Sequence, residues 1–158
     1  AFLAILLLGG PLQEEFGWRG YALPRLVARF RPPAATLVLA VVWTGWHLPF
    51  WFMHGSGMAG TPLPVYFVYM LGLTAVMTWL YVRTAGSVLA AILMHATANW
   101  ISNVLPTHTA ETVASNAYLF QAVGYLLIGA LLLWRTSHAS ARSPRGAHAV
   151  GSSWRIAD

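Results

Sequence analysis

The chain contains no cysteine and no lysine, and only four of its 158 residues are acidic. The lack of cysteine excludes a disulfide framework and a zinc site built from thiolates. Charged residues make up 8% of the sequence, against about 25% in an average soluble domain. Apolar residues make up 58%, and the mean hydropathy is positive. The composition therefore predicts a membrane protein.

Four apolar stretches approach the length of about 20 residues that a membrane-spanning helix needs. They cover residues 34–52, 65–82, 87–104 and 118–134. A fifth stretch, residues 1–8, is too short to cross a bilayer and lacks the features of a signal peptide. We interpret it as the end of a helix that begins earlier in a longer protein. We expect an all-α, polytopic transmembrane helix bundle of about four full spans plus a truncated N-terminal span.

The composition changes after the last apolar stretch. From Arg135 onward the chain is rich in Ser, Arg, His and Gly and shows no hydrophobic periodicity. Such a segment cannot bury enough apolar surface to fold by itself. The sequence therefore predicts a membrane domain over residues 1–134 and a disordered basic tail over residues 135–158.

All nine basic residues are arginines, and eight of them lie in connections or in the tail. Counting the spans alternately places these eight on one side of the membrane, whereas the opposite loops contain no arginine. By the positive-inside rule we expect the arginine-rich loops and the C-terminal tail to be cytoplasmic. Membrane topology thus explains the basic pI without a nucleic-acid partner. The eight residues are Arg25, Arg29, Arg31, Arg83, Arg135, Arg142, Arg145 and Arg155.

Two adjacent glutamates, Glu14 and Glu15, are expected near the end of the N-terminal apolar helix. A carboxylate in a bilayer costs roughly 2.5–3.5 kcal/mol on insertion scales, so such groups are expected to be paired or to perform chemistry. Arg19 follows one helical turn after Glu15 and is its expected ion-pair partner. Glu14 has no equally obvious local partner. Further along the sequence, Pro24 is expected to interrupt this helix.

Two further polar sets lie inside predicted spans. His47 follows one turn after Trp43, and the i, i+4 spacing of His95 and Asn99 places both on one helix face. At about 1.5 Å per helical residue, these sets and the glutamates lie roughly 16 to 24 Å from the arginine side. We therefore expect the three sets to meet at similar depth.

The combination suits hydrolysis. A glutamate shielded from bulk water can act as general base on a water molecule that a neutral histidine also holds. A second histidine and an asparagine amide supply donors for an oxyanion. Each group also has a purely structural interpretation. Glu15 and Arg19 would form an ion pair, and His47 would bond a backbone carbonyl near Pro49. His95 and Asn99 would make interhelical hydrogen bonds.

Taken together and in this order, Glu-Glu-x-x-x-Arg, aromatic-x-x-x-His and His-x-x-x-Asn resemble the motifs of the CPBP family of intramembrane proteases. That family includes the CAAX prenyl endopeptidases of the Rce type and the bacterial Abi-like proteins. The resemblance covers roughly residues 1–104, with the last span as a trailing helix. It implies a membrane endopeptidase that uses a glutamate-activated water on a membrane-associated substrate, in some members a prenylated CAAX-type one.

The resemblance also implies roles for individual residues. Glu14 is the catalytic base and His47 is its partner on the water. Trp43 stands where the family motif usually has phenylalanine, a position expected to need only an aromatic wall. The oxyanion site is formed by His95 and Asn99, and the supporting pair by Glu15 and Arg19.

Two alternatives stay open. The family has often been labelled metalloprotease, and although the chain lacks the His-Glu-x-x-His motif, Glu14, His47 and His95 are candidates for a three-ligand zinc site. Our prediction is a metal-free mechanism without a cofactor. The alternative function is a non-catalytic membrane protein of the bacteriocin-immunity type that binds a peptide, and a proton-relaying transporter is a weaker third. In each case the bilayer is the expected partner.

Overall fold

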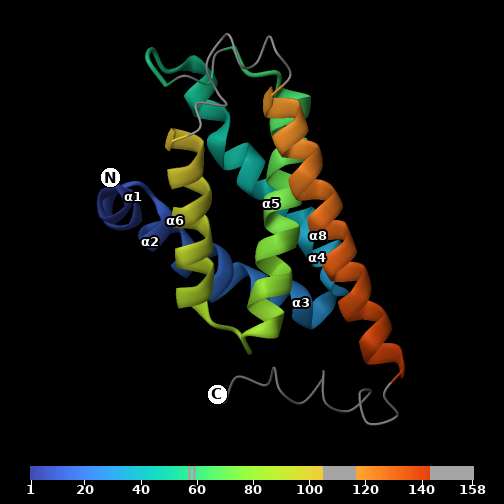
Figure 1. The fold of residues 1–158 in the computed structure, drawn as a ribbon. Coiled ribbons are helices and arrows are strands. Elements are labelled where there is room, and N and C mark those ends of the chain that lie inside the picture. Colours follow the sequence, from blue (N-terminus) through green and yellow to red (C-terminus); the bar gives the residue numbers. More distant parts are fainter. Residues whose placement is uncertain (57, 59, 105–116, 143–158) are drawn as a thin grey trace.

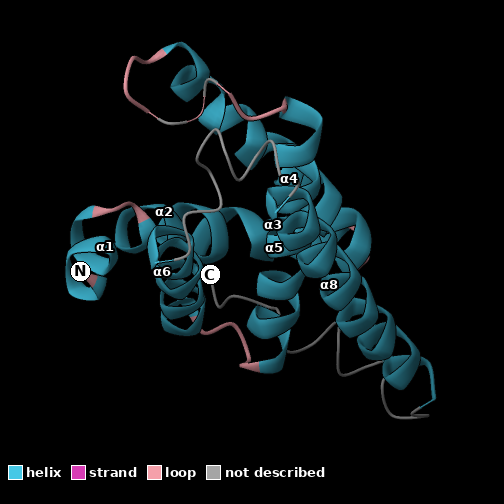
Figure 2. Cartoon of the chain, turned by 45° about the horizontal axis from the view of Figure 1, so that its top comes forward, coloured by secondary structure: helices cyan, strands magenta, loops and turns pink. Residues whose placement is uncertain are grey.

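The regular elements of the described residues are all helices, as Figure 2 shows, which confirms the all-α prediction. The computed structural model describes residues 1–56, 58, 60–104 and 117–142, with the side chains of the last helix described over residues 118–135. In chain order the elements are α1 (Phe2–Leu8), α2 (Pro11–Gly17), the π-helical turn η1 (Trp18–Ala22), α3 (Leu23–Arg29), α4 (Pro32–His47), the 3-10 segment η2 (Leu48–Phe52), α5 (Leu63–Arg83), α6 (Val88–Val104) and α8 (Ala117–Arg142).

Three helical segments are long and apolar enough to cross a membrane, namely Pro32–Phe52, Leu63–Arg83 and Tyr118–Arg135. The helix Val88–Val104 is apolar but shorter, with 17 residues. Each of the four starts within two residues of a predicted span, so the predicted membrane helix bundle is confirmed. The small differences at two starts arise because prolines fit the first helical turn, where their missing N–H is not needed.

α8 extends further than predicted. We expected the last span to end at residue 134 and the chain to be disordered from Arg135, but the helix continues to Arg142. Residues 135–142 contain neither glycine nor proline, so this stretch carries no stop signal. The remainder of the predicted tail, residues 143–158, lies outside the described residues.

The glutamates do not lie on the N-terminal apolar helix, contrary to our expectation. α1 ends before Gly9, and Gly10 adopts a positive φ of 101° before α2 begins at Pro11. A left-handed glycine followed by a proline is a helix stop followed by a helix start. Figure 1 shows α1 end-on, so its axis lies across that of α6. The apolar helix α1 and the glutamate-bearing helix α2 are therefore two separate helices.

Pro24 does not break the helix that follows. The chain stays helical from α2 through η1 into α3. A proline inside a helix lacks the N–H that would bond four residues back, here to Gly20, and its ring crowds that carbonyl. The chain accommodates Pro24 with the wide turn η1, in which the Leu23 N–H bonds to the Trp18 carbonyl five residues earlier. Such π turns are frequent at functional sites.

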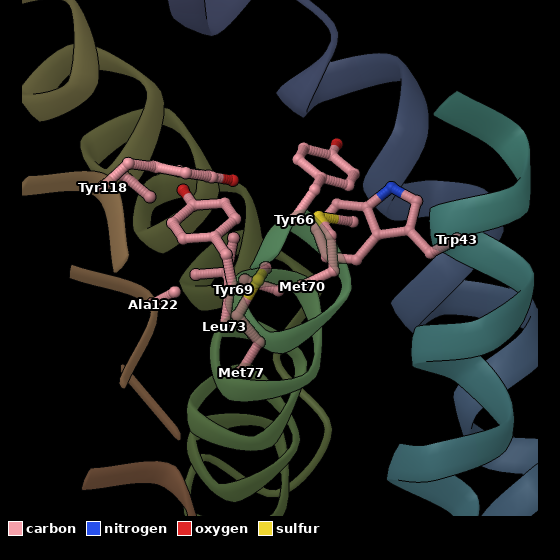
Figure 3. Close-up of a cluster of buried hydrophobic side chains, with 10 residues drawn as sticks. Trp43, Tyr66, Tyr69, Met70, Leu73, Met77, Tyr118 and Ala122 are labelled. Carbon is pink, nitrogen blue, oxygen red and sulfur yellow. The ribbon is translucent and has the colours of Figure 1, made fainter. Parts of the chain in front are cut away.

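α5 lies at the centre of the bundle and contacts α4, α6 and α8 (Figure 1). Its approach to α8 is very close, because a Cβ atom at Gly72 would collide with the backbone nitrogen of Leu126. Small residues allow membrane helices to pack backbone against backbone in this way. The main buried cluster (Figure 3) lies where α5 meets α4, α6 and α8, and it consists of Trp43, Tyr66, Tyr69, Met70, Leu73, Met77, Ala91, Ala98, Tyr118 and Ala122.

Candidate active site

Glu14 is half-buried in α2 and is held through one of its two carboxylate oxygens. Oε2 accepts the indole N–H of Trp43 at 2.9 Å and that of Trp18 at 3.3 Å. Oε1 accepts no hydrogen bond from the described residues and lies beside Gly10, where a Cβ atom would be only 2.6 Å from it. The carboxylate is therefore anchored through Oε2, and the acceptor capacity of Oε1 is unused by the described residues.

Trp18 is the contact that sequence reasoning missed. It follows Glu14 by four residues, the same spacing that pairs Glu15 with Arg19, and this spacing is the signal that identifies it. The bond to Trp43 spans 29 positions in the sequence and depends on how α4 packs against α2. No local pattern predicts such a bond.

His47 lies at the last position of α4, where the chain tightens into η2. Its Nδ1 is 2.8 Å from the Trp43 carbonyl oxygen, one turn earlier in the same helix. Since a carbonyl oxygen only accepts, Nδ1 carries the hydrogen, and in the neutral ring Nε2 presents a lone pair. The backbone-carbonyl bond considered for His47 thus exists, although its acceptor is Trp43 rather than a carbonyl freed near Pro49. This bond orients the ring and leaves Nε2 able to accept a hydrogen from water.

Glu15, Arg19 and His95 form a buried charged cluster. Arg19 Nη1 donates to both carboxylate oxygens of Glu15, at 2.8 and 2.9 Å, and Nδ1 of His95 is 2.8 Å from Oε1 of the same group. The side chains of Glu15 and Arg19 are completely buried, and that of His95 is 5% exposed. The expected pair Glu15–Arg19 is therefore present, and it extends across the bundle to α6.

The bond to Glu15 restricts what His95 can do. A carboxylate accepts, so Nδ1 of His95 carries a hydrogen, and only Nε2 is left to face a substrate. Donation from Nε2 to an oxyanion requires the doubly protonated ring, whose charge Glu15 would offset. Asn99 lies one turn further along α6 and is half-buried, and its side chain lines a cavity of about 350 Å³. Of the two expected oxyanion donors, Asn99 therefore reaches open space directly.

Trp43 connects both halves of the site. Its indole N–H bonds Glu14, and its carbonyl bonds His47. Its ring packs edge-on against His95 with the centroids 5.2 Å apart, and the Arg19 guanidinium carbon lies 4.3 Å from its centre. An arginine over a tryptophan face is an attractive cation–π pair. Trp43 is thus a hydrogen-bond donor and a packing centre, which goes beyond the aromatic wall we expected at this position.

Glu14, His47 and His95 are the three candidate zinc ligands. Among the residues that the structure describes, no group of three His, Asp or Glu side chains is placed to hold a metal ion. His47 and His95 bond a carbonyl and a carboxylate through Nδ1, so the ring nitrogen left for any further partner is Nε2 in both residues. The site offers one carboxylate oxygen that accepts no hydrogen bond from the described residues, the Nε2 atoms of two histidines and one amide.

Trp43→Phe tests the indole contact, since it keeps an aromatic ring and restores the residue usual in the family motif. Loss of a hydrogen bond to a charged group is worth about 1.5–3 kcal/mol, so we expect peptide hydrolysis by the full-length protein to fall by roughly one to two orders of magnitude. Trp46→Phe is the matched control, because Trp46 is exposed and makes no hydrogen bond to Glu14. Equal activity in both variants would reduce Trp43 to an aromatic wall.

Comparisons with known proteins agree with these motifs. The family model "Type II CAAX prenyl endopeptidase Rce1-like" matches residues 1–101, which contain every residue of the cluster. The chain is also similar to CAAX prenyl protease 2 of Methanococcus maripaludis, with 25% identity over 138 residues. That match covers 80% of this chain and 48% of the relative, so the chain spans about half the length of the curated relative. No solved structure gives a significant match. Because the family model covers well over half of the sequence, this chain belongs to the Rce1-like type II CAAX prenyl endopeptidase family.

Proposed function

We propose that this chain carries the catalytic centre of an intramembrane endopeptidase that hydrolyses a peptide bond with a water activated by Glu14. The state of Glu14 carries the proposal. Two indoles hold Oε2 in place, and Oε1 accepts no hydrogen bond from the described residues. A purely structural carboxylate would be expected to have both oxygens paired, as Glu15 does.

In the proposed reaction, the water donates one hydrogen to Oε1 of Glu14 and the other to Nε2 of His47. Its oxygen attacks the substrate carbonyl carbon while Glu14 takes the proton. The resulting oxyanion is stabilised by the Asn99 amide, together with His95 when its ring is doubly protonated. When the carbon–nitrogen bond breaks, Glu14 returns the proton to the leaving nitrogen. The products are a carboxyl group and an amine, and no covalent enzyme intermediate forms.

Glu15 and Arg19 support this chemistry without touching the substrate. The positive charge of Arg19 acts on Glu14 as well as on Glu15. Glu15 in turn fixes both Arg19 and His95 through short hydrogen bonds. We assign Glu15 and Arg19 as positioning residues.

The orientation in the membrane is also a proposal. The end of α3, the start of α4, the end of α5 and the last part of α8 lie together at the lower end of the bundle in Figure 1. These segments carry Arg29, Arg31, Arg83 and Arg135. By the positive-inside rule this end, which we call the arginine end, is cytoplasmic.

Each hydrolysed peptide bond creates two new peptide termini, so the termini present in cell membranes test the proposed activity for any substrate. We expect new termini in membranes that contain the full-length protein, and their loss with His47→Phe, which removes both ring nitrogens. His54→Phe is the matched control, because His54 is exposed and lies in the connection after η2. Mass spectrometry at equal protein levels measures the result. If neither the wild type nor His47→Phe, both folded, produced new termini, the result would instead favour a peptide-binding protein of the immunity type.

A further inference from the structure

A groove lies between the start of α4 and the last part of α8, at the arginine end of the bundle. Both helices pack against α5 but contact each other only slightly, so a space remains between them with α5 as its floor. Its volume is about 450 Å³, and Arg31 is the one charged residue among the described residues that line it. The walls are otherwise mainly apolar and include Pro33, Leu71, Ala75, Leu126 and Leu133.

The groove is separate from the active site. None of the catalytic residues proposed above lines it, and Thr36, its innermost residue on α4, comes seven residues before Trp43, which is roughly 10 Å along the helix. The cavity that Asn99 lines is different again, because it lies between the helix ends formed by the start of α5 and the end of α6. The groove is therefore a second candidate binding site with its own ligand.

The depth of the groove matches one leaflet of a bilayer. On α8, Leu126 lies nine residues before Arg135, and on α5, Leu71 lies twelve residues before Arg83. At about 1.5 Å per helical residue, the groove extends roughly 14–18 Å inward from the arginine end. The hydrocarbon core of a bilayer is about 30 Å thick, so one leaflet contributes about 15 Å. A groove of this length and composition fits one acyl chain of a lipid.

Arg31 gives the outer end of the groove a positive charge. It is exposed and directly precedes α4, and its side chain forms no ion pair or hydrogen bond with the described residues. Trp134 is exposed and lines the groove from α8. Tryptophan is enriched where a membrane meets water, so its position places this end at the level of the lipid headgroups. The Arg31 guanidinium is therefore available to an anion at that level.

We propose that the groove between α4 and α8 binds one anionic phospholipid from the leaflet at the arginine end. One acyl chain fills the groove, and the phosphate pairs with Arg31, whose planar guanidinium matches the geometry of phosphate oxygens. Basic pockets between membrane helices bind anionic headgroups in this way. A zwitterionic lipid offers the same chain without a net charge, so Arg31 favours the anionic class. This inference goes beyond the proposed peptidase function and does not depend on it.

Lipid binding to the purified full-length protein in detergent tests the inference. Native mass spectrometry measures the dissociation constants of phosphatidylglycerol and phosphatidylcholine with identical acyl chains. We expect phosphatidylglycerol to bind more tightly, and Arg31→Gln to weaken it about fivefold, which corresponds to about 1 kcal/mol for one basic residue near an anionic lipid. Arg25→Gln is the matched control, because Arg25 is exposed at the same end and does not line the groove.

A second pair of variants tests whether the acyl chain occupies the groove. Ala130 lines the groove, so Ala130→Phe fills it with a ring and should weaken phosphatidylglycerol binding about tenfold. Leu127→Phe should leave binding unchanged, because Leu127 is exposed on α8 outside the groove. The unfolding midpoint reports whether each variant is folded. Arg31→Gln changes an exposed side chain, so the test stands even if Ala130→Phe does not fold.

Two results would overturn the inference. The first is equal binding of phosphatidylglycerol by the wild type, Arg31→Gln and Ala130→Phe, which would place the lipid elsewhere. The second is equal binding of both lipids by the wild type, with a loss only in Ala130→Phe. That result would assign the groove to a lipid chain without any role for the charge of Arg31.

Discussion

Glu14→Gln is expected to abolish peptide hydrolysis while the protein keeps its fold. Glutamine has almost the same shape, and its side-chain oxygen still accepts the indole N–H groups of Trp18 and Trp43. It cannot take a proton from water. Removal of a general base reduces rates by about 10²–10⁴. We expect the upper part of this range, because both oxygens of Glu15, the neighbouring carboxylate, are already hydrogen-bonded. The measurement is the rate at which new peptide termini appear with purified full-length protein in vesicles.

The control for this experiment makes the same chemical change elsewhere. Glu111→Gln removes a carboxylate that lies outside all three motifs, and we expect full activity. The unfolding midpoint of each variant in detergent reports whether the fold is intact. If Glu14→Gln lowered the midpoint strongly and the remaining folded protein still cleaved its substrate, Glu14 would be a structural group and another residue would be the base.

Arg19→Met is expected to have the largest effect on stability. It leaves the Glu15 carboxylate completely buried with only His95 as a partner. Breaking a buried ion pair on one side costs about 3–5 kcal/mol, since the remaining charge is uncompensated. The loss is measured as the shift in the unfolding midpoint of the purified protein. Arg25→Met is the matched control, because Arg25 is exposed and donates only to a backbone carbonyl.

A double variant separates charge from packing in the same cluster. Replacing both partners of a buried pair with apolar residues is often close to neutral, so Arg19→Met combined with Glu15→Leu should recover much of the lost stability. Activity should not return, because His95 then lacks its acceptor. Equal midpoints for Arg19→Met and Arg25→Met would show that the pair contributes little to the fold.

The local parts of the site are predictable from the sequence, and the contacts between helices are not. The spacing of Glu15 and Arg19 predicts their ion pair because residues four apart on a helix are neighbours. The links from Glu14 to Trp43 and from Glu15 to His95 join positions 29 and 80 residues apart. They depend on helix crossing and rotation, which hydrophobic length does not determine. Depth arithmetic correctly suggested that the sets meet, without identifying which atoms pair.

The fold also combines features that the sequence predicts with features that depend on packing. Span length predicts the four long helices, because the bilayer sets that length. The direction of the chain before α2 depends on one backbone angle at Gly10. The glycine and proline there indicate a break, but the apolar run before them is close enough in sequence to the glutamates to favour one continuous helix. Likewise, Pro24 indicates a disturbed helix, and whether the result is a kink or a wide turn depends on packing around η1.

The double attachment of Trp43 has a mechanical consequence. His47 belongs to α4 and is bonded to Trp43 within that helix, so the two form one body. Glu14 belongs to α2 and meets this body at the indole nitrogen. If α2 and α4 tilt against each other about this bond, the atoms nearest the bond move least and those at the far helix ends move most. Changes in bilayer thickness tilt membrane helices. Such tilting would widen or narrow the cavity between the helix ends, while the spacing between the base and the histidine stays nearly constant.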